Sequence, residues 1–480
     1  MKKSFWSRIA ALGMTVVLLF GLVACGDGKN PNGDSNSDAN NTGKTDDSVV
    51  DLGGYEFVLA SPFIQDSPDM ETLMGSERSF EEARQYVEKT YKCKIKVTSL
   101  WPSMENLRAK TMTGDKYADV IHIPMNFLLQ AIRAGYIQDL NTVKGLYSDD
   151  YRWVKACTEM ATYDKGVYGL NFMRPSEVRT CLVYNRDVLK KCGITESMEQ
   201  LVRDKQWTFD KFAELLKKCT KDTNGDGKTD IYGMIPAIWN ELGFAMINSN
   251  GGSLVKVENG VAKENFSAPE AVTALNYLTK WLNEDKTVAN VYGADSRLGV
   301  TTQAYANYFV NGECAFMFCE SWLITQQIKP IANNVDYGIL PLPMGPSATD
   351  YVSNANNALV FAIPSTNTKD VDKTVIVMNA LAKAVAGEEN DSEAQAAYDY
   401  GIMMDYFGKE DADATEMYNL ILSKSYVDRG AAVDSLLADF GAEVVVDACY
   451  RQFGTPAAAI ESISGMYDDE INSIYNKKDY

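Results

Sequence analysis

Three tryptophans stand beside polar residues at the predicted ends of strands or in loops. They occur in the sequences Trp101-Pro102-Ser103, Trp239-Asn240-Glu241 and Glu320-Ser321-Trp322. A flat aromatic ring can cover the apolar CH face of a sugar, while nearby amides and carboxylates bond its hydroxyl groups. The alternative is that these rings belong to the core, which is our interpretation of Trp153 and Trp281. For Trp239 and Trp322 we favour a binding pocket.

Side chains suited to catalysis are scarce. The one histidine, His122, lies in a predicted buried strand, so we interpret it as a core residue. A catalytic triad or a Cys-His pair needs an imidazole at the mouth of a site, and metal-dependent hydrolysis needs several nitrogen or sulfur ligands. Glycoside hydrolysis needs only two carboxylates and stays open as the enzymatic alternative, because the chain has 65 acidic residues. We expect no enzyme activity and no catalytic cofactor.

Residues 222–230 have the spacing of an EF-hand-type calcium loop. The bidentate glutamate expected at the twelfth position is replaced by Gly233. A metal-free turn is the alternative, because Asp-Gly and Asn-Gly build turns unaided. Both interpretations, a structural calcium ion and a bare turn, are kept as expectations. Four side chains and one main-chain carbonyl would supply the oxygen ligands: Asp222, Asn224, Asp226 and Asp230, with the carbonyl of Lys228.

The first fifty residues predict export and a lipid anchor. Three basic residues precede an apolar run over 9–24, which is typical of a signal peptide. The ending Leu22-Val23-Ala24-Cys25 resembles the bacterial lipobox, in which the cysteine is lipidated; an ordinary signal peptide is the alternative. Residues 26–48 are rich in Gly, Ser, Asn and Asp and predict a flexible tether. We expect the protein on the outer face of the cytoplasmic membrane, anchored through Cys25.

Charge and cysteine content exclude other classes of protein. The formal net charge of −19 argues against binding nucleic acid, and no basic run suggests otherwise. Eight cysteines follow Cys25, each alone in an apolar pattern and none in a CxxC pair. Zinc and iron–sulfur sites therefore have little support, and we predict mostly free, buried thiols.

The elements that would position these residues follow an α/β pattern. Predicted strands alternate with predicted helices, and Ser79 with Glu82 suggests a capping box that begins the first helix. This order predicts a parallel sheet, with ligands beyond the carboxyl ends of its strands. Phe63, Trp101 and residues 124–126 would lie there. The strands are expected over residues 55–61, 93–101 and 117–124, and the helices over 79–91, 103–115 and 126–140.

A second pattern links this sheet to the rest of the chain. Residues 167–172 and 178–185 predict two strands around a turn at Pro175, followed by a helix that ends at Gly193. Since 480 residues are too many for one ordinary core, such a strand pair could carry the chain from one lobe to another. The chain after residue 390 predicts mostly helix.

Five segments resemble, in the same order, those of the extracellular solute-binding proteins of ABC importers, the family that includes maltodextrin-binding protein. Each carries a recognisable stretch, such as FVNGECAFMFCESW or YGILPLPMGP. Ala118 and Asn171 depart from the family pattern, which has proline at both places. The resembling region runs from about residue 55 to 385, and its segments are residues 113–141, 166–194, 207–220, 309–322 and 337–346.

The resemblance implies a two-lobed α/β fold of the periplasmic-binding-protein type (type II), with hinge strands between the lobes. It implies a monomer that captures a carbohydrate, most simply an oligosaccharide, and delivers it to an ABC permease. Members of the family that hold calcium in an Asp/Asn/Gly loop support the calcium interpretation. The alternatives are a protein that binds peptides or another solute, and a surface glycan-capture protein without a transporter.

The resemblance also implies site residues and a division of the chain. Arg174 and Glu177, in the turn between the lobes, are added from their position. The expected ligand-binding residues are Phe63, Trp101, Met125, Asn126, Arg174, Glu177, Trp239, Asn240, Glu320 and Trp322. The expected division is a signal peptide (1–24), an anchor and linker (25–50), a first lobe (51–165 and 343–385), a second lobe (166–342) and a helical C-terminal part (386–480), mostly in the second lobe.

Overall fold

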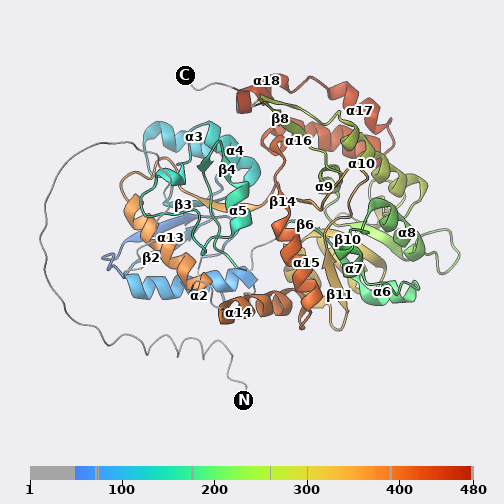
Figure 1. Cartoon of the computed structure of the whole chain (residues 1–480), viewed down its shortest axis with the longest axis horizontal. Coiled ribbons are helices and arrows are strands. Elements are labelled where there is room, and N and C mark those ends of the chain that lie inside the picture. The colour runs from blue at the N-terminus through green and yellow to red at the C-terminus, as the bar shows by residue number, and fades with distance from the viewer. Residues whose placement is uncertain are drawn as a thin grey trace, which may run out of the picture. The chain divides into compact units, whose positions relative to one another are not determined.

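Two four-stranded sheets, each with its own helices, organise the chain (Figure 1). The computed structural model describes residues 49–66, 68–70, 73, 75–174, 178–259, 261–299, 301–388 and 392–476. The predicted signal peptide, Cys25 and most of the predicted linker lie outside these residues. Over the described ranges, no helix combines the length and the apolar character needed to cross a membrane.

The first sheet has the order β13-β3-β1-β2. Strands β1 (Glu56–Ala60), β2 (Lys94–Thr98) and β3 (Val120–Pro124) run parallel, as predicted, and β13 (Leu359–Ala362) runs antiparallel to β3. Helices α2 (Gly75–Tyr91) and α13 (Val371–Ala386) pack on one face, and α3 (Met104–Thr113) and α4 (Met125–Arg133) pack on the other (Figure 1). We call this sheet with its helices the first lobe.

Two helices of the first lobe test the helix ends that were predicted from the local sequence. Helix α3 begins as predicted, since Ser103 accepts a hydrogen bond from the Asn106 backbone, and it ends at Gly114, whose φ is 70°. The predicted capping box at Ser79 is wrong, because α2 already begins at Gly75. The carboxylate of Glu82 instead pairs with Arg78 at 3.2 Å, one turn earlier in the same helix.

The second sheet has the order β11-β6-β10-β7. Strand β6 (Thr180–Asn185) runs antiparallel to β10 (Cys314–Glu320) and to β11 (Tyr337–Leu340), while β7 (Tyr232–Pro236) runs parallel to β10. All residues of these strands are buried, as expected for a sheet covered on both faces. We call this sheet with its helices the second lobe.

The C-terminal part is helical, as predicted, and completes the core of the second lobe. Helices α14 (Ser392–Ile402), α15 (Ala412–Ser423), α16 (Asp434–Asp439) and α17 (Pro456–Ile463) follow one another, with a π-helical segment over Phe440–Tyr450. Their apolar side chains share one buried cluster with the strands of the second sheet and with α8 (Phe209–Cys219) and α10 (Pro269–Thr279).

The predicted strand over 167–172 is wrong in its extent. Only β5 (Gly166–Val167) is a strand, and Leu170 then exchanges two backbone hydrogen bonds, of 3.0 and 2.7 Å, with Phe361 of β13. Asn171 interrupts the ladder because its side chain donates to the Leu359 carbonyl at 2.9 Å and accepts from the Met173 backbone at 2.8 Å. Phe172 packs on Phe361, and β6 joins the second sheet at Thr180. The crossing between lobes therefore lies between Phe172 and Thr180.

The chain returns to the first lobe beside this crossing. Strand β12 (Ser353–Asn354) pairs with β14 (Ser425–Tyr426) and leads into β13. The Thr180 hydroxyl donates to the Asn354 carbonyl at 2.9 Å, and the Ser353 hydroxyl donates to the Thr180 carbonyl at 2.7 Å. Two segments far apart in sequence are thus held together where the chain passes between the lobes.

The eight cysteines after Cys25 are free thiols, and their predicted burial is confirmed. Seven are buried and Cys192 is half-buried. Cys181 and Cys319 face each other in β6 and β10 with their sulfur atoms 3.8 Å apart. Burial raises the pKa of the Cys93 thiol to about 11, so this thiol stays protonated at neutral pH.

Candidate functional site

A cavity of about 380 Å³ is lined by residues from both lobes, and we call it the cleft. It lies beyond the carboxyl end of β3, which closes with Pro124, and that of β10, which closes with Glu320. Ligands of open α/β sheets bind at such strand ends. Its lining residues are Phe63, Glu77, Trp101, Pro124, Asn126, Phe127, Arg179, Glu320, Trp322, Gln326, Asn357 and Leu359.

Five of the predicted site residues line the cleft: Phe63, Trp101, Asn126, Glu320 and Trp322. Trp101 and Phe63 are 41% and 38% exposed, and their ring centroids are 5.3 Å apart in an edge-to-face contact. Such large exposed rings are costly unless a ligand or partner covers them. The aromatic residues come from both lobes, since Trp101 follows β2 and Trp322 follows β10.

A fixed polar group lies among these rings. The Trp322 indole donates to Glu320 Oε2 at 2.6 Å, and the Arg179 guanidinium lies 3.7 Å from the same oxygen. Glu320 and Arg179 are both more than nine-tenths buried, so water screens their attraction only weakly. Asn126 Oδ1 is buried without a hydrogen-bond partner among the described residues. The cleft therefore offers a bound molecule a hydrogen-bond acceptor (Asn126), a cation (Arg179) and an aromatic ring fixed by its hydrogen bond (Trp322).

A second cavity of about 660 Å³ adjoins the cleft, because Asn357 lines both. Trp239 and Asn240, at the start of α9 (Trp239–Ser249), lie here and not in the cleft. Trp239 meets Tyr292 edge to face at 4.7 Å between centroids. The remaining lining includes carboxylates, amides and a cation: Glu241, Asp434, Asp447, Asn356 and Arg451.

Glu241 stands where the two cavities meet and accepts from Asn357 Nδ2 at 3.4 Å. Burial, together with the negative charge of Glu320, raises the pKa of Glu241 from its usual 4.5 to about 7. The folded state therefore binds more protons than the unfolded state between pH 4.5 and 7. The free energy of unfolding must fall as the pH rises through this window.

Replacing Glu241 by glutamine should remove this pH dependence. We expect Glu241→Gln to match the wild type below pH 4.5 and to be more stable by about 3 kcal/mol above pH 7, since glutamine carries no charge to bury. Urea unfolding at several pH values measures the difference. Glu284→Gln, at an exposed glutamate, is the control and should follow the wild type throughout. Parallel curves for Glu241→Gln and the wild type would contradict the assignment.

Two predicted residues, Met125 and Arg174, line neither cavity. Met125 is fully buried in the core between α4 and the first sheet, so its prediction is wrong; the next two residues, Asn126 and Phe127, reach the cleft instead. Arg174 donates to the Tyr151 carbonyl at 2.9 Å and lines neither cavity. Glu177 lies outside the described residues.

Arg179 and Asn357 were missed as site residues. Arg179 directly precedes β6, and Asn357 lies two residues before β13. Because β13 runs antiparallel to β3, its first residues lie at the edge where β3 ends. A buried arginine at the start of an apolar strand was the available signal for Arg179, since such a charge needs an acidic partner from elsewhere.

The structure does not support the calcium prediction for residues 222–230. Asp222 accepts from the backbone of Gly225 at 2.7 Å and of Gly227 at 2.9 Å, and Asp230 accepts from the Thr223 backbone at 2.7 Å. The loop thus holds itself as a series of side-chain-to-backbone turns. No group of three or more histidine, cysteine or acidic side chains that could hold a metal occurs in the described part of the chain.

A family model and a curated relative match the sequence of the chain. Residues 75–390 match the family model described as bacterial extracellular solute-binding protein. The lipoprotein LipO of Bacillus subtilis (strain 168) is 28% identical over 172 residues, which cover 32% of this chain and 30% of LipO. The chain therefore matches less than a third of this curated relative.

Two solved structures show the same fold. An ABC substrate-binding protein from Listeria monocytogenes in complex with cycloalternan matches with a TM-score of 0.60 and 16% identity, covering 88% of this chain and all of that one. UgpB from Mycobacterium tuberculosis in complex with glycerophosphocholine matches with a TM-score of 0.60 and 12% identity, covering 88% of this chain and 98% of that one. With its two lobes and the family match over residues 75–390, the chain belongs to the bacterial extracellular solute-binding proteins.

Proposed function

We propose that the protein binds an oligosaccharide in the cleft and delivers it to the membrane subunits of an ABC importer. The observation that carries the proposal is the pairing of aromatic rings from both lobes, Trp101 and Trp322, around a fixed carboxylate, Glu320. Sugars need apolar faces for their CH surfaces and polar groups in the same plane as their hydroxyls. The Listeria protein, which was solved in complex with cycloalternan, supports this class of ligand.

The adjoining cavity favours a chain of sugars over a single one. The cleft of about 380 Å³ and the second cavity of about 660 Å³ meet at Asn357, and each has its own aromatic residues. A ligand that spans both would place one sugar against Trp322 and another against Trp239. Binding would draw the two lobes together through the crossing segments at Thr180 and Ser353.

The remaining parts of the proposal concern location and the absence of catalysis. The protein would be anchored by a lipid on Cys25 to the outer face of the cytoplasmic membrane, as a monomer; the similarity to lipoprotein LipO supports the anchor. The crossings support a division into two lobes, with the first boundary after Phe172 in place of residue 166 and the return near Ser353 in place of residue 343. The membership of a binding-protein family supports the expectation that the cleft carries out no reaction.

A thermal-shift screen of the folded chain tests the class of ligand. We expect neutral oligosaccharides of two to four residues to raise the melting temperature by several degrees at millimolar concentration, because a ligand bound only by the folded state stabilises it. Short peptides and glycerophosphocholine, the ligand of UgpB, serve as the other arms. If a peptide or glycerophosphocholine raised the melting temperature and no sugar did, the ligand would not be an oligosaccharide and the proposal would be wrong.

A further inference from the structure

A smaller cavity of about 50 Å³ shares part of its lining with the cleft. Both are lined by Phe63, Glu77, Arg179 and Leu359, so the two spaces adjoin. The smaller one is also lined by His122, the only histidine in the sequence. A volume of this size holds a few water molecules or one small substituent, but no sugar ring.

Neighbouring side chains hold the His122 ring in place. It pairs with Phe361 across β3 and β13, and the two rings stack at 4.4 Å with 12° between their planes. Phe63 covers the imidazole edge-on at 5.8 Å. The Nδ1 atom lies 3.1 Å from the hydroxyl of Ser61, which follows β1 in the same sheet. Packing and this hydrogen bond therefore fix both the position and the direction of the ring.

The other ring nitrogen is unsatisfied. His122 is 3% exposed, and its Nε2 has no hydrogen-bond partner among the residues that the structure describes. A buried polar atom is costly unless something bonds it, so a partner beyond the described residues is expected. Burial, with the positive charge of Arg179, lowers the pKa of His122 to about 3, and the imidazole is neutral at physiological pH.

We propose that the smaller cavity receives a hydroxyl or hydroxymethyl group of the bound ligand and that Nε2 of His122 hydrogen-bonds it. The inference rests on the proposed function, because this cavity adjoins the same cleft. A neutral imidazole offers one donor and one acceptor, and Ser61 can either donate to Nδ1 or accept from it. A hydroxyl group also donates and accepts, so it suits Nε2 in either tautomer. An ammonium or a carboxylate would suit only one.

The geometry makes His122 a determinant of specificity at one end of the ligand. A ligand without a hydroxyl at that end would leave Nε2 unsatisfied and would bind more weakly. Discrimination by a site built to hydrogen-bond a hydroxyl is stronger than discrimination by apolar fit, because the unmatched polar atom stays buried. The interpretation of His122 as a satisfied core residue is thereby corrected at one nitrogen only.

Nitrogen NMR of the wild-type chain tests the proposal directly. Since there is one histidine, selective ¹⁵N-histidine labelling gives the signals of a single imidazole. Maltotriose, cellotriose and xylotriose are the probes, each followed in parallel by calorimetry. We expect a sugar that binds by calorimetry to shift the Nε2 resonance. The Nδ1 resonance, already bonded to Ser61, should move less.

Three variants separate the hydrogen bond from the packing. Phenylalanine in His122→Phe keeps the stacking on Phe361 but removes both nitrogens, and we expect about tenfold weaker binding of the same sugar. His122→Gln places its amide where Nε2 lies and should recover part of the affinity. His122→Asn reaches only as far as Nδ1 and should not. Melting temperatures of the variants check that each one is folded.

The outcomes separate this inference from the proposed function. A sugar that binds by calorimetry while leaving the Nε2 resonance unchanged overturns the role of His122 and leaves the proposed function standing. The same conclusion follows if His122→Phe is folded and binds as the wild type does. If no oligosaccharide binds in either measurement, the proposed function fails and this inference fails with it.

Discussion

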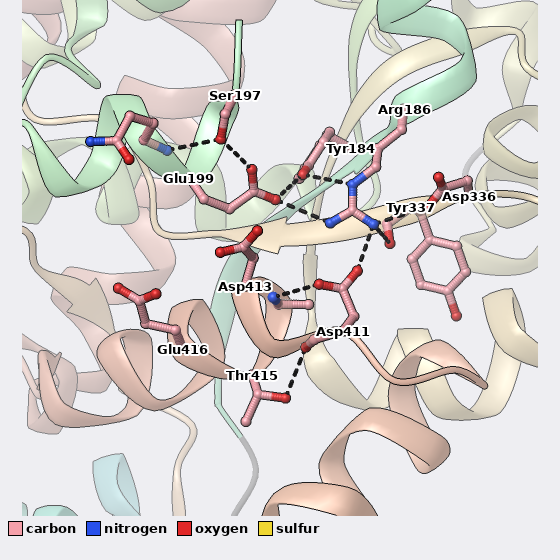
Figure 2. A network of polar contacts seen from close by, with 12 residues as sticks. Tyr184, Arg186, Ser197, Glu199, Asp336, Tyr337, Asp411, Asp413, Thr415 and Glu416 are labelled. Atoms are coloured by element: carbon pink, nitrogen blue, oxygen red, sulfur yellow. Dashed lines mark hydrogen bonds and ion pairs between the residues drawn. The ribbon is translucent and has the colours of Figure 1, made fainter.

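Replacing Arg186 by methionine is expected to lower the free energy of unfolding by about 3 kcal/mol at pH 7. Arg186 begins α6 (Arg186–Lys191), and its guanidinium binds three carboxylates from separate elements (Figure 2). Nη1 lies 2.7 Å from Asp411 and 2.9 Å from Asp336, and Nη2 lies 3.1 Å from Glu199. Nε also donates to the Tyr184 hydroxyl at 3.0 Å, and that hydroxyl donates to Glu199.

The loss is large because the carboxylates cannot return to water. The side chains of Glu199 and Asp411 are 7% and 11% exposed. Without the arginine, Glu199 stays buried without an ion pair among the described residues, and Asp411 keeps only Lys409 at 3.8 Å. Burying an unpaired carboxylate costs more than the ion pair contributes when intact. Asp411 also caps α15 by accepting from the Ala414 backbone at 2.9 Å. The loss of Arg186 should therefore also destabilise the start of this C-terminal helix.

Arg203→Met is the matched control for this prediction. Arg203 joins α7 (Met198–Arg203) to the same helix α15, through Asp413 and Glu416. These two carboxylates are 56% and 50% exposed, so solvent screens the pairs and the expected loss is about 0.5 kcal/mol. Urea unfolding followed by circular dichroism measures both variants. If both variants lost the same free energy of unfolding, the burial of the carboxylates would not explain how much each ion pair contributes.

At acid pH, the free energies of unfolding of Arg186→Met and the wild type should differ less than at pH 7. Burial alone would raise the pKa of Glu199, but its hydrogen bonds with Tyr184 and Arg186 lower it below the usual value. A depressed carboxyl pKa stabilises the folded state above the unfolded pKa, and that contribution is lost as the pH falls through the folded value. As the pH falls below 4.5 and through the lower folded pKa of Glu199, the wild type loses this contribution, and the two stabilities should converge.

The sequence predicts those parts of the fold that depend on neighbours in the chain. Ser103 and Gly114 bound α3 as expected, because capping is a contact between residues three or four apart. The five predicted site residues in the cleft follow predicted strand ends, and the sheet brings strand ends together whatever their distance in sequence. Met125 was misassigned by one position, since the first residue of α4 turns its side chain toward the sheet.

Contacts between distant segments could not be predicted in the same way. Arg179 meets Glu320, and Arg186 meets Asp411, across separations of 141 and 225 residues. Neither pair has a spacing that marks it, and 65 acidic residues offer many equivalent partners. The orphan nitrogen of His122 is a similar case, because its state depends on which side chains surround it. The strand pattern alone indicates only that His122 is buried.

Trp322→Ala is expected to weaken the binding of any oligosaccharide more than tenfold, because a lost stacking face costs ~1–3 kcal/mol. The ring lines the cleft, and its Nε1 holds Glu320 in place at 2.6 Å. Trp322→Phe separates these two roles, since it keeps a stacking face but removes the bond to Glu320. It should recover part of the affinity. Wild-type affinity in a folded Trp322→Ala variant would remove the cleft as the binding site.

Trp239→Ala should behave differently because Trp239 lines the second cavity and not the cleft. A disaccharide held in the cleft would not reach it, so its affinity should change less than twofold. Longer oligosaccharides should lose about tenfold, since stacking on Trp239 then contributes. Calorimetry with a series from two to six sugars compares both variants, and Trp153→Phe, in the core of the first lobe, controls for altered stability. A loss at Trp239 that is equal for every ligand length would contradict a site that extends from the cleft through Asn357.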